Sequence, residues 1–290
     1  MRSRALSRVS QVPSEILSKD MKQAMIFAAG LGTRLKPLTD TMPKALVRVG
    51  GQPLLWHVIQ KLKAAGYEFL VVNVHHFAEQ IVDYLKANDN FGLDIRISDE
   101  TDGLLETGGG IKKALPLFDP SEPILIHNVD ILSNLDLTDS EVRGYDGAGA
   151  RDYLQLLNYS RSPVPPRLRT PEAVLVVSQR KTKRYLQFDD DMRLIGWKNI
   201  ETGEVKGREG RPLAFSGIHI FHPSLAPLME DWPDRFPIMD FYLKVCADHV
   251  IRGFEAPNLH LLDVGKLDTL EQANMFIETN MNNVNNIIHE

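Results

Sequence analysis

The stretch AAGLGTRLKPLTDTMPKAL, residues 28–46, decides how the rest of the chain is interpreted. The short apolar run at residues 24–27 precedes it and is typical of a buried strand. The chain then enters a loop that contains Gly30 and Gly32. Because glycine has no side chain, the backbone can approach a ligand and direct successive N–H groups at an anion.

Two cations follow these glycines. Arg34 carries a forked guanidinium and Lys44 carries a point charge, so the loop suits a polyphosphate. The loop is not a Walker A loop, because Gly32 is not followed by Lys and then Ser or Thr. It is not a dinucleotide fingerprint either, because Leu35 stands where a third Gly or Ala is needed. A simple tight turn is the alternative, and the two cations favour the phosphate hypothesis.

The string of residues 28–44 resembles the signature of the sugar-1-phosphate nucleotidylyltransferases. Within this superfamily it is most similar to bacterial N-acetylmuramate-1-phosphate uridylyltransferases and to mannose-1-phosphate guanylyltransferase-like proteins. The resemblance covers about residues 21–138 and 173–280 and is lost between them. It implies the nucleotide-diphospho-sugar transferase type of α/β fold, a Rossmann-like mixed, mainly parallel sheet flanked by helices.

The composition is that of an ordinary globular protein, with 290 residues, of which 43% are hydrophobic and 24% are charged. The net charge of −5 implies no general affinity for nucleic acid or anionic membranes, so local cations must hold an anionic substrate. No apolar run approaches the length of a membrane span. Cys246 is the single cysteine, which excludes an intrachain disulfide. We expect a small buried residue there, and a catalytic thiol is a remote alternative.

We expect one nucleotidylyltransferase domain over residues 21–290, in a cytoplasmic protein that is a monomer or a homodimer. Residues 1–20 are interpreted as a disordered extension or a wrongly assigned start, although MRSRALSRVS superficially fits an organellar transit peptide. Residues 139–172 break the pattern with several prolines and arginines, and are interpreted as a surface insertion, partly disordered. In the functional alternative, Arg161, Arg167 and Arg169 reach an anionic substrate or partner.

Strands and helices alternate through the first half of the chain, which predicts a parallel sheet covered on both faces. Strands are expected at residues 24–28, 69–74, 93–98, 124–128, 173–178, 185–188, 194–197, 214–221 and 260–264, and helices at 54–65, 78–87, 109–117, 240–250 and 267–280. Ligands bind outside the carboxyl ends of such strands. The glycine loop, residues 73–75 and Asp130 lie at these ends independently of any resemblance. Asp189, Asp190 and Asp191 are expected to form a hairpin turn and not a metal cluster.

The resemblance implies that a sugar 1-phosphate attacks the α-phosphate of a nucleoside triphosphate and that pyrophosphate leaves. The barrier is mainly repulsion between anions and loss of alignment, which Mg2+ and cations reduce. The resemblance assigns Arg34 and Lys44 to catalysis, and Asp130 and Asp263 to Mg2+. Alternatively, each aspartate simply caps a strand end. The chain departs from the family pattern in carrying Val129 before the first aspartate and Lys266 after Gly265.

The segment LETGGG resembles the part of the family that contacts the nucleotide base. Thr107 at a helix N-cap is a compatible structural alternative. Glu100 is expected to help form the base pocket. The residues assigned to the nucleotide are Ala28, Ala29, Gly30, Gly32, Thr33, Glu100, Glu106, Thr107, Gly108 and Gly109.

The sugar is assigned to Asn73 in NVHHF, to Ser216 and Gly217 in FSGIHIF, and to Asp240 in RFPIMDFYL. Asp240 either bonds a sugar hydroxyl or caps its helix. His75 and His76 are adjacent and cannot face the same side of a strand, so a zinc site is not expected.

The preferred reaction is uridylyl transfer from UTP to N-acetylmuramate 1-phosphate, in cell-wall sugar recycling. Guanylyl transfer to mannose 1-phosphate is the first alternative, and thymidylyl transfer to glucose 1-phosphate is the second. The chain has no room for the long C-terminal β-helix of some relatives, so no added acyltransferase is expected. A non-catalytic sugar-nucleotide-sensing domain is the alternative of another class. The presence of Arg34, Lys44, Asp130 and Asp263 argues against that alternative.

Overall fold

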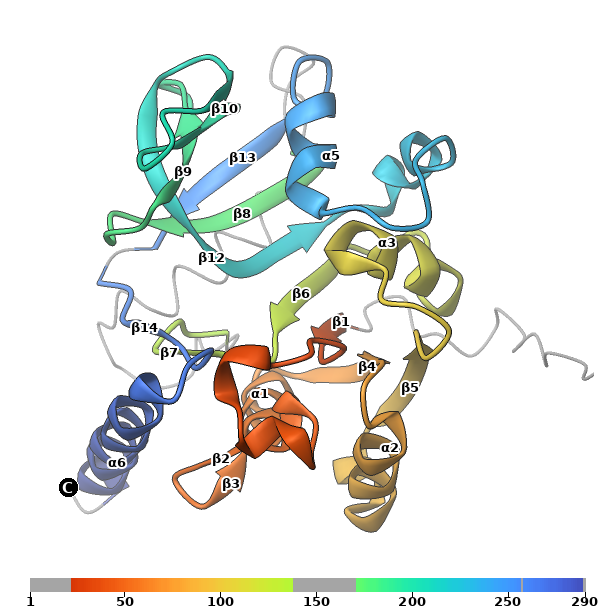
Figure 1. The fold of residues 1–290 in the computed structure, drawn as a ribbon, viewed down its shortest axis with the longest axis vertical. Helices are drawn as coiled ribbons and strands as arrows, with labels where there is room; N and C mark the ends of the chain where they lie inside the picture. The colour runs from red at the N-terminus through yellow and green to blue at the C-terminus, as the bar shows by residue number, and fades with distance from the viewer. Residues whose placement is uncertain (1–21, 138–170, 257, 289–290) are drawn as a thin grey trace, which may run out of the picture.

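The computed structural model describes residues 22–137, 171–256 and 258–288 (Figure 1). The extension expected at residues 1–20 lies outside this range, and so does the insertion expected at 139–172, apart from Pro171 and Glu172. The described residues form a mixed sheet with helices packed on it, as the sequence predicts. No described helix combines the length and the apolar character needed to cross a membrane.

Four parallel strands form the half of the sheet that carries the glycine loop. They are β1 (Lys22–Phe27), β4 (Tyr67–Val74), β5 (Asp94–Asp99) and β6 (Ile124–Asn128). β1 lies in the middle and pairs with β4 on one side and β6 on the other, with Phe27 in register with both Asn73 and Asn128. The carboxyl ends of the four strands therefore meet at one edge, which confirms the expectation from the strand and helix alternation.

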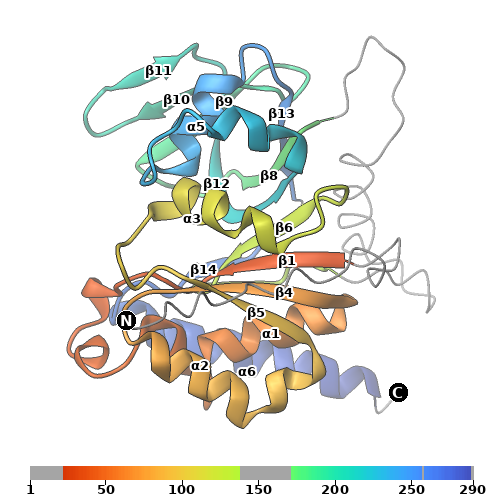
Figure 2. The same ribbon diagram turned by 90° about the vertical axis from the view of Figure 1, so that its right-hand side faces the viewer.

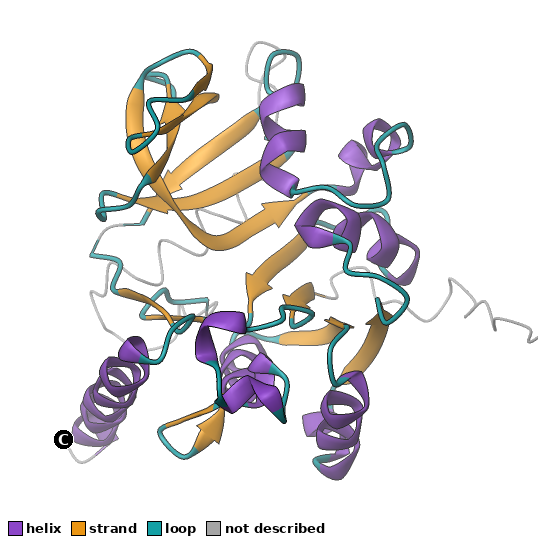
Figure 3. Cartoon of the chain, in the orientation of Figure 1, coloured by secondary structure: helices purple, strands orange, loops and turns teal. Residues whose placement is uncertain are grey.

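The second half of the sheet is mainly antiparallel (Figure 3). β12 (Arg211–Phe221) runs antiparallel to β6 and joins the two halves. The strands beyond it are β8 (Ala173–Ser178), β9 (Arg184–Phe188), β10 (Leu194–Asn199), β11 (Val205–Gly207) and β13 (Ile251–Glu255). The turn between β9 and β10 is the expected hairpin, because the Asp189 carboxylate accepts hydrogen bonds from the backbone N–H groups of Asp191 and Arg193.

Two small antiparallel pairs complete the strands. β2 (Arg48–Val49) pairs with β3 (Gln52–Pro53), and β7 (Ile131–Ser133) pairs with β14 (Leu261–Asp263). The second pair matters for the site, because it brings a C-terminal segment beside the end of β6.

Helices cover both faces of the parallel half (Figure 2). α1 (Leu54–Ala64), α2 (Ala78–Ala87) and α6 (Asp268–Ile288) lie on one face, and α3 (Glu106–Ala114) lies on the other with α5 (Ile238–Val245) beyond it. Side chains alternate between the faces: Ala24 and Ile26 join one apolar core and Met25 joins the other. Both faces are apolar because both are covered.

The boundaries of three predicted helices were wrong. α6 ends at Ile288 and not at 280. α3 begins three residues before the expected position at 109, and its glycines pack closely on a neighbouring segment. α5 begins at Ile238 and ends at Val245, not at 250. The Glu172 carboxylate contacts the His249 ring and accepts a hydrogen bond from the Val250 N–H, and the chain then continues into β13 beside β8.

Two fully buried histidines make stability depend on pH. Burial lowers the pKa of His219 to about 3 and that of His127 to about 4, so both are neutral in the folded protein. The unfolded chain binds these protons below about pH 6.5, so stability is fully present above that pH and falls on acidification. When the pH falls from about 6.5 to 5, we expect protonation of His219 in the unfolded chain to lower the unfolding free energy by about 2 kcal/mol.

The measurement is urea unfolding across this pH range for the wild type and for His219→Leu. The variant should show a flatter profile, because neither ring nitrogen of His219 has a hydrogen-bond partner in the described structure. His76→Gln is the control, since His76 is exposed. Parallel profiles for the wild type and His219→Leu would contradict the assignment.

Candidate active site

A cavity of about 380 Å³ opens at the carboxyl ends of the four parallel strands. We call it the first cavity. Each strand end contributes to its wall, and helix α3 supplies the opposite side. The lining residues are Phe27, Ala29, Gly30, Lys44, Asn73, Glu100, Leu104, Glu106, Thr107, Asn128, Val129 and Asp130. The parallel sheet therefore brings together residues that are up to about a hundred positions apart in the sequence.

The Asn73 side chain holds the start of the glycine loop. Asn73 is 1% exposed, and its Oδ1 accepts hydrogen bonds from the N–H groups of Ala28 (2.7 Å) and Ala29 (3.3 Å). Its Nδ2 donates to the buried Glu100 carboxylate at 2.7 Å. The other Glu100 oxygen accepts from the Leu105 N–H at 3.2 Å. These contacts give Asn73 and Glu100 a positioning role at the wall of the cavity, and sugar binding by Asn73 stays a prediction.

Gly32 allows the loop to fold back on itself. Its φ of +63° is in the left-handed region, and a Cβ there would lie 2.9 Å from Thr39 Cγ2 and 3.0 Å from Lys44 Cβ. The Thr39 hydroxyl donates to the Gly32 carbonyl at 2.9 Å. This packing fixes Lys44, whose side chain is 10% exposed and forms an ion pair with the Asp130 carboxylate. Thr33 begins a short 3-10 turn and is exposed.

Asp263 lies beside Asp130 because β14 pairs with β7. Asp263 is in register with Ile131, and the Val264 N–H donates to the Asp130 carbonyl at 2.8 Å. The surrounding protein desolvates Asp263 and raises its pKa, and the Asp130 carboxylate raises it further. Lys44, Arg34 and Arg180 oppose this shift. The two predicted aspartates and the two predicted cations therefore form one group of interacting charges, which we call the charge cluster.

Gly265 leaves room for two members of this charge cluster, Asp263 and Arg34. A Cβ at Gly265 would lie 2.6 Å from the Asp263 carboxylate and 2.8 Å from the Arg34 guanidinium. The residue has no side chain, so the carboxylate and the guanidinium both fit against the backbone. Lys266 is exposed.

The LETGGG segment divides between the first cavity and a neighbouring segment of the chain. Glu106 and Thr107 line the first cavity, but the N–H groups of Gly108 and Gly109 donate to the Phe236 carbonyl (2.8 and 3.2 Å). A side chain on either glycine would overlap with the segment that contains Phe236. The packing of these two glycines is explained by the Phe236 segment, and their contact with a base stays a prediction. Thr107 is not an N-cap, since its hydroxyl accepts from the Ile238 N–H at 2.9 Å.

Three residues assigned to the sugar lie outside the lining of the first cavity. Ser216 is buried, and its hydroxyl bonds the backbone of Ile218. Gly217 has a φ of +81°, and a Cβ there would lie 2.7 Å from Asn128 Nδ2. Asp240 lines a second cavity and pairs with Lys206 at 3.0 Å. Asp240 does not cap α5, which begins two residues earlier.

Some residues of the site were missed by the sequence prediction. Phe27, Leu104, Asn128 and Val129 line the first cavity, and Arg180 acts electrostatically on Asp263. Asn128 could have been predicted, because it lies at the end of an expected strand. Arg180 could not have been predicted from a local sequence pattern, because only the tertiary fold brings the end of β8 near β14. His75 and His76 diverge as expected: His75 Nδ1 contacts the Glu100 carbonyl, and His76 is exposed.

The buried Asn73 contacts predict the outcome of truncating this side chain. Asn73→Ala removes the acceptor for two loop N–H groups and the donor for the Glu100 carboxylate. We expect a loss of about 2–4 kcal/mol in unfolding free energy, because buried polar groups are left unpaired. Denaturant unfolding measures it. Asn88→Ala is the matched control, since Asn88 is exposed and bonds only the Tyr84 carbonyl within its own helix end. Equal stability of the two variants would contradict this role.

Comparisons with known proteins agree with this geometry. Residues 23–143 match the family model described as nucleotidyl transferase. An N-acetylmuramate alpha-1-phosphate uridylyltransferase from Caulobacter vibrioides is 49% identical over 116 residues, which are 39% of this chain and 48% of that protein. A mannose-1-phosphate guanyltransferase from Kluyveromyces lactis is 38% identical over 112 residues, which are 38% of this chain and 31% of that protein.

The solved structure of the inositol-1-phosphate CTP transferase from T. maritima has a TM-score of 0.65 at 15% identity, covering 87% of this chain and 95% of that one, which shows a shared fold. The chain spans about half the length of the curated uridylyltransferases that it matches. Residues 23–143 are therefore similar in sequence to nucleotidyl transferases, and the chain shares the fold of the solved CTP transferase.

Proposed function

We propose that the chain catalyses Mg2+-dependent transfer of a nucleotidyl group from a nucleoside triphosphate to a sugar 1-phosphate, giving a nucleotide sugar and pyrophosphate. The observation that carries the proposal is the meeting of the glycine loop, Lys44, Asp130 and Asp263 at one edge of the parallel sheet. This arrangement supplies backbone N–H groups, cations and carboxylates within one cleft, and phosphoryl chemistry needs all three.

The residues of the chain would act mainly by positioning and by charge. The triphosphate lies along the glycine loop, where Asn73 keeps the backbone of Ala28 and Ala29 in place. Arg34 and Lys44 would offset the repulsion between two phosphorylated reactants, and Lys44 would act more strongly because it is nearly buried. Glu106 and Thr107 close the opposite wall of the cavity over the nucleoside.

The two aspartates fit the needs of Mg2+. This ion takes one or two carboxylates and fills its remaining positions with phosphate oxygens and water. The Asp130 carboxylate helps to raise the pKa of Asp263, as expected when two carboxylates lie close together. The described part of the chain holds no cluster of three or more potential metal ligands, so the substrate phosphates would complete the site. When bound, Mg2+ would neutralise phosphate charge in the transition state.

Uridylyl transfer to N-acetylmuramate 1-phosphate is the preferred form of the reaction, and we place it in cell-wall sugar recycling. The support is the 49% identity over 116 residues to a protein named for that reaction. Guanylyl transfer to mannose 1-phosphate is the second candidate, supported by the 38% identity to a guanyltransferase over 112 residues.

The test is pyrophosphate release with Mg2+, over a grid of UTP, GTP, dTTP and CTP against several sugar 1-phosphates. We expect release with UTP and N-acetylmuramate 1-phosphate, and none when Mg2+ is removed with EDTA. Release with GTP and mannose 1-phosphate would support the same type of reaction with a different pair of substrates. A folded protein that releases no pyrophosphate with any pair would contradict the proposed function.

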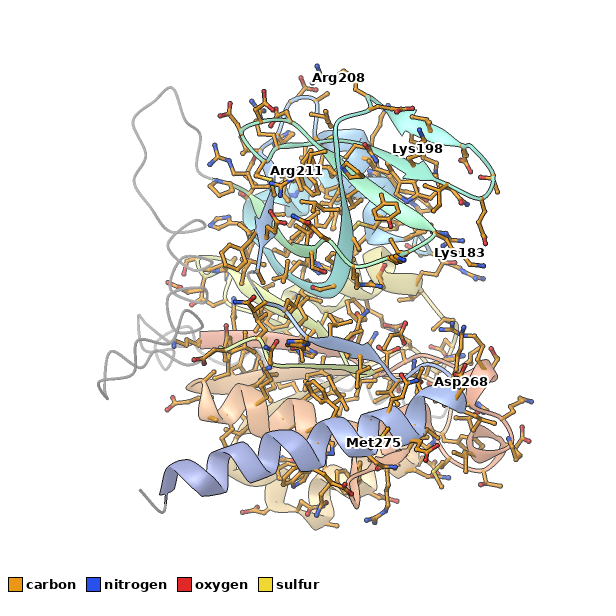
Figure 4. The ribbon with its side chains drawn as sticks, turned by 90° about the vertical axis from the view of Figure 1, so that its left-hand side faces the viewer. Lys183, Lys198, Arg208, Arg211, Asp268 and Met275 are labelled. Atoms are coloured by element: carbon orange, nitrogen blue, oxygen red, sulfur yellow. The ribbon has the colours of Figure 1, made fainter. Side chains whose placement is uncertain are left out.

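The aspartate pair gives a second prediction. Asp130→Asn and Asp263→Asn keep the side-chain shape and remove one carboxylate charge each, so each should lower kcat by about a hundredfold or more. Both variants should remain folded, as circular dichroism would verify. Asp268→Asn is the matched control, because Asp268 is exposed at the start of α6 (Figure 4). Turnover that Asp263→Asn leaves unchanged would remove Asp263 from the metal site.

A further inference from the structure

A second cavity, of about 480 Å³, lies between the antiparallel strands and α5. Its wall includes three cations, Arg180, Arg184 and Lys206, together with the aromatic rings of Trp197 and Phe215. None of these residues belongs to the catalytic set described above, except that Arg180 acts electrostatically on Asp263. The cavity therefore needs a separate explanation.

The second cavity adjoins the first along β12. Phe215 lines the second cavity, and Gly217 lies against Asn128, which lines the first. Phe215 and Gly217 are only two positions apart in β12, so the two linings lie close together. The cavities also approach each other at α5, where Ile238 bonds Thr107 of the first cavity and its neighbour Met239 lines the second. A sugar phosphate that reaches the first cavity can therefore extend into the second.

The side chains that line the second cavity carry a net positive charge. Lys206 and Asp240 neutralise each other at 3.0 Å. Glu204 is the other acid in the lining and balances only one of the two arginines. Arg180 is fixed in place, since its Nη2 donates to the Phe215 carbonyl at 2.7 Å. Among the described residues, no hydrogen bond or ion pair engages the Arg184 guanidinium.

The remaining wall is apolar and aromatic. The Lys206 ammonium lies 5.4 Å from the centre of the Trp197 ring and holds one edge of the wall. Leu186 and Leu243 extend the apolar surface. Ligand sites of this kind combine an apolar surface with a few charged groups that fix orientation. Two guanidiniums beside an apolar wall suit a ring-shaped ligand that carries a carboxylate.

We propose that Arg184, supported by Arg180, binds a carboxylate carried by the sugar, so that the substrates are acidic sugar 1-phosphates. This inference rests on the proposed function, because it concerns the sugar of the same reaction. It makes Arg184 a specificity residue that discriminates between sugars and takes no part in the transfer step. A neutral sugar of the same size leaves the guanidinium without its partner and binds more weakly.

The test is calorimetric binding of UDP-N-acetylmuramate and UDP-N-acetylglucosamine, which differ only in the carboxylate-bearing ether. The wild type should bind the carboxylate-bearing nucleotide about tenfold more tightly or better, as expected for a charged hydrogen-bonded pair. Arg184→Gln should remove most of this preference while leaving the affinity for the neutral nucleotide unchanged. Arg180→Gln provides a second variant that should reduce the same preference.

Arg208→Gln is the matched control, because it makes the same change of charge on an exposed residue outside the cavity lining (Figure 4). Equal affinities in the wild type, binding of neither nucleotide, or a preference that Arg184→Gln retains would overturn the inference. Its failure is distinct from failure of the proposed function. Pyrophosphate release confined to neutral sugars would overturn only the carboxylate site, and a carboxylate preference without any pyrophosphate release would overturn only the transfer reaction.

Discussion

The side-chain amide of Asn73 is the contact on which the site depends. A glycine loop has many accessible conformations, and ordering it costs entropy unless other groups hold it. Asn73 offers an acceptor to the first two loop N–H groups and a donor to Glu100, which in turn holds the segment before α3. One buried relay thus links the ends of β1, β4 and β5 to the opposite wall of the first cavity. The walls keep their spacing before any ligand arrives, which is the preorganisation that transfer chemistry needs.

The second constraint is charge. The chain has a formal net charge of −5, yet its proposed substrates are anions. Lys44, Arg34 and Arg180 lie near Asp263, and Lys44 pairs with Asp130, so the site has local cations despite the negative net charge of the chain. The β7–β14 pair makes this possible, because it carries Asp263 from the C-terminal part of the chain to the end of β6. The fold places the two aspartates side by side, and the cations make that arrangement tolerable.

The strand ends could be predicted from the sequence because apolar runs followed by polar residues are local signals. Asp130 and the glycine loop were located in this way, and the described strands place them as expected. The contacts of Gly108, Gly109 and Asp240 could not be predicted, since they depend on partners at residues 236 and 206 that no local pattern connects to them. The end of α5 was missed for the same reason. The apolar run into β13 continues the helical pattern, and only pairing with β8 makes it a strand.

In the proposed reaction the triphosphate, Mg2+ and both aspartates meet at the carboxyl ends of the parallel strands. The most direct measurement is a crystal structure with a non-hydrolysable UTP analogue and Mn2+ in place of Mg2+, located by its anomalous signal. We expect one Mn2+ peak in contact with the carboxylates of Asp130 and Asp263, with the phosphates along the glycine loop. A nucleotide bound elsewhere, or a peak that touches neither aspartate, would contradict it.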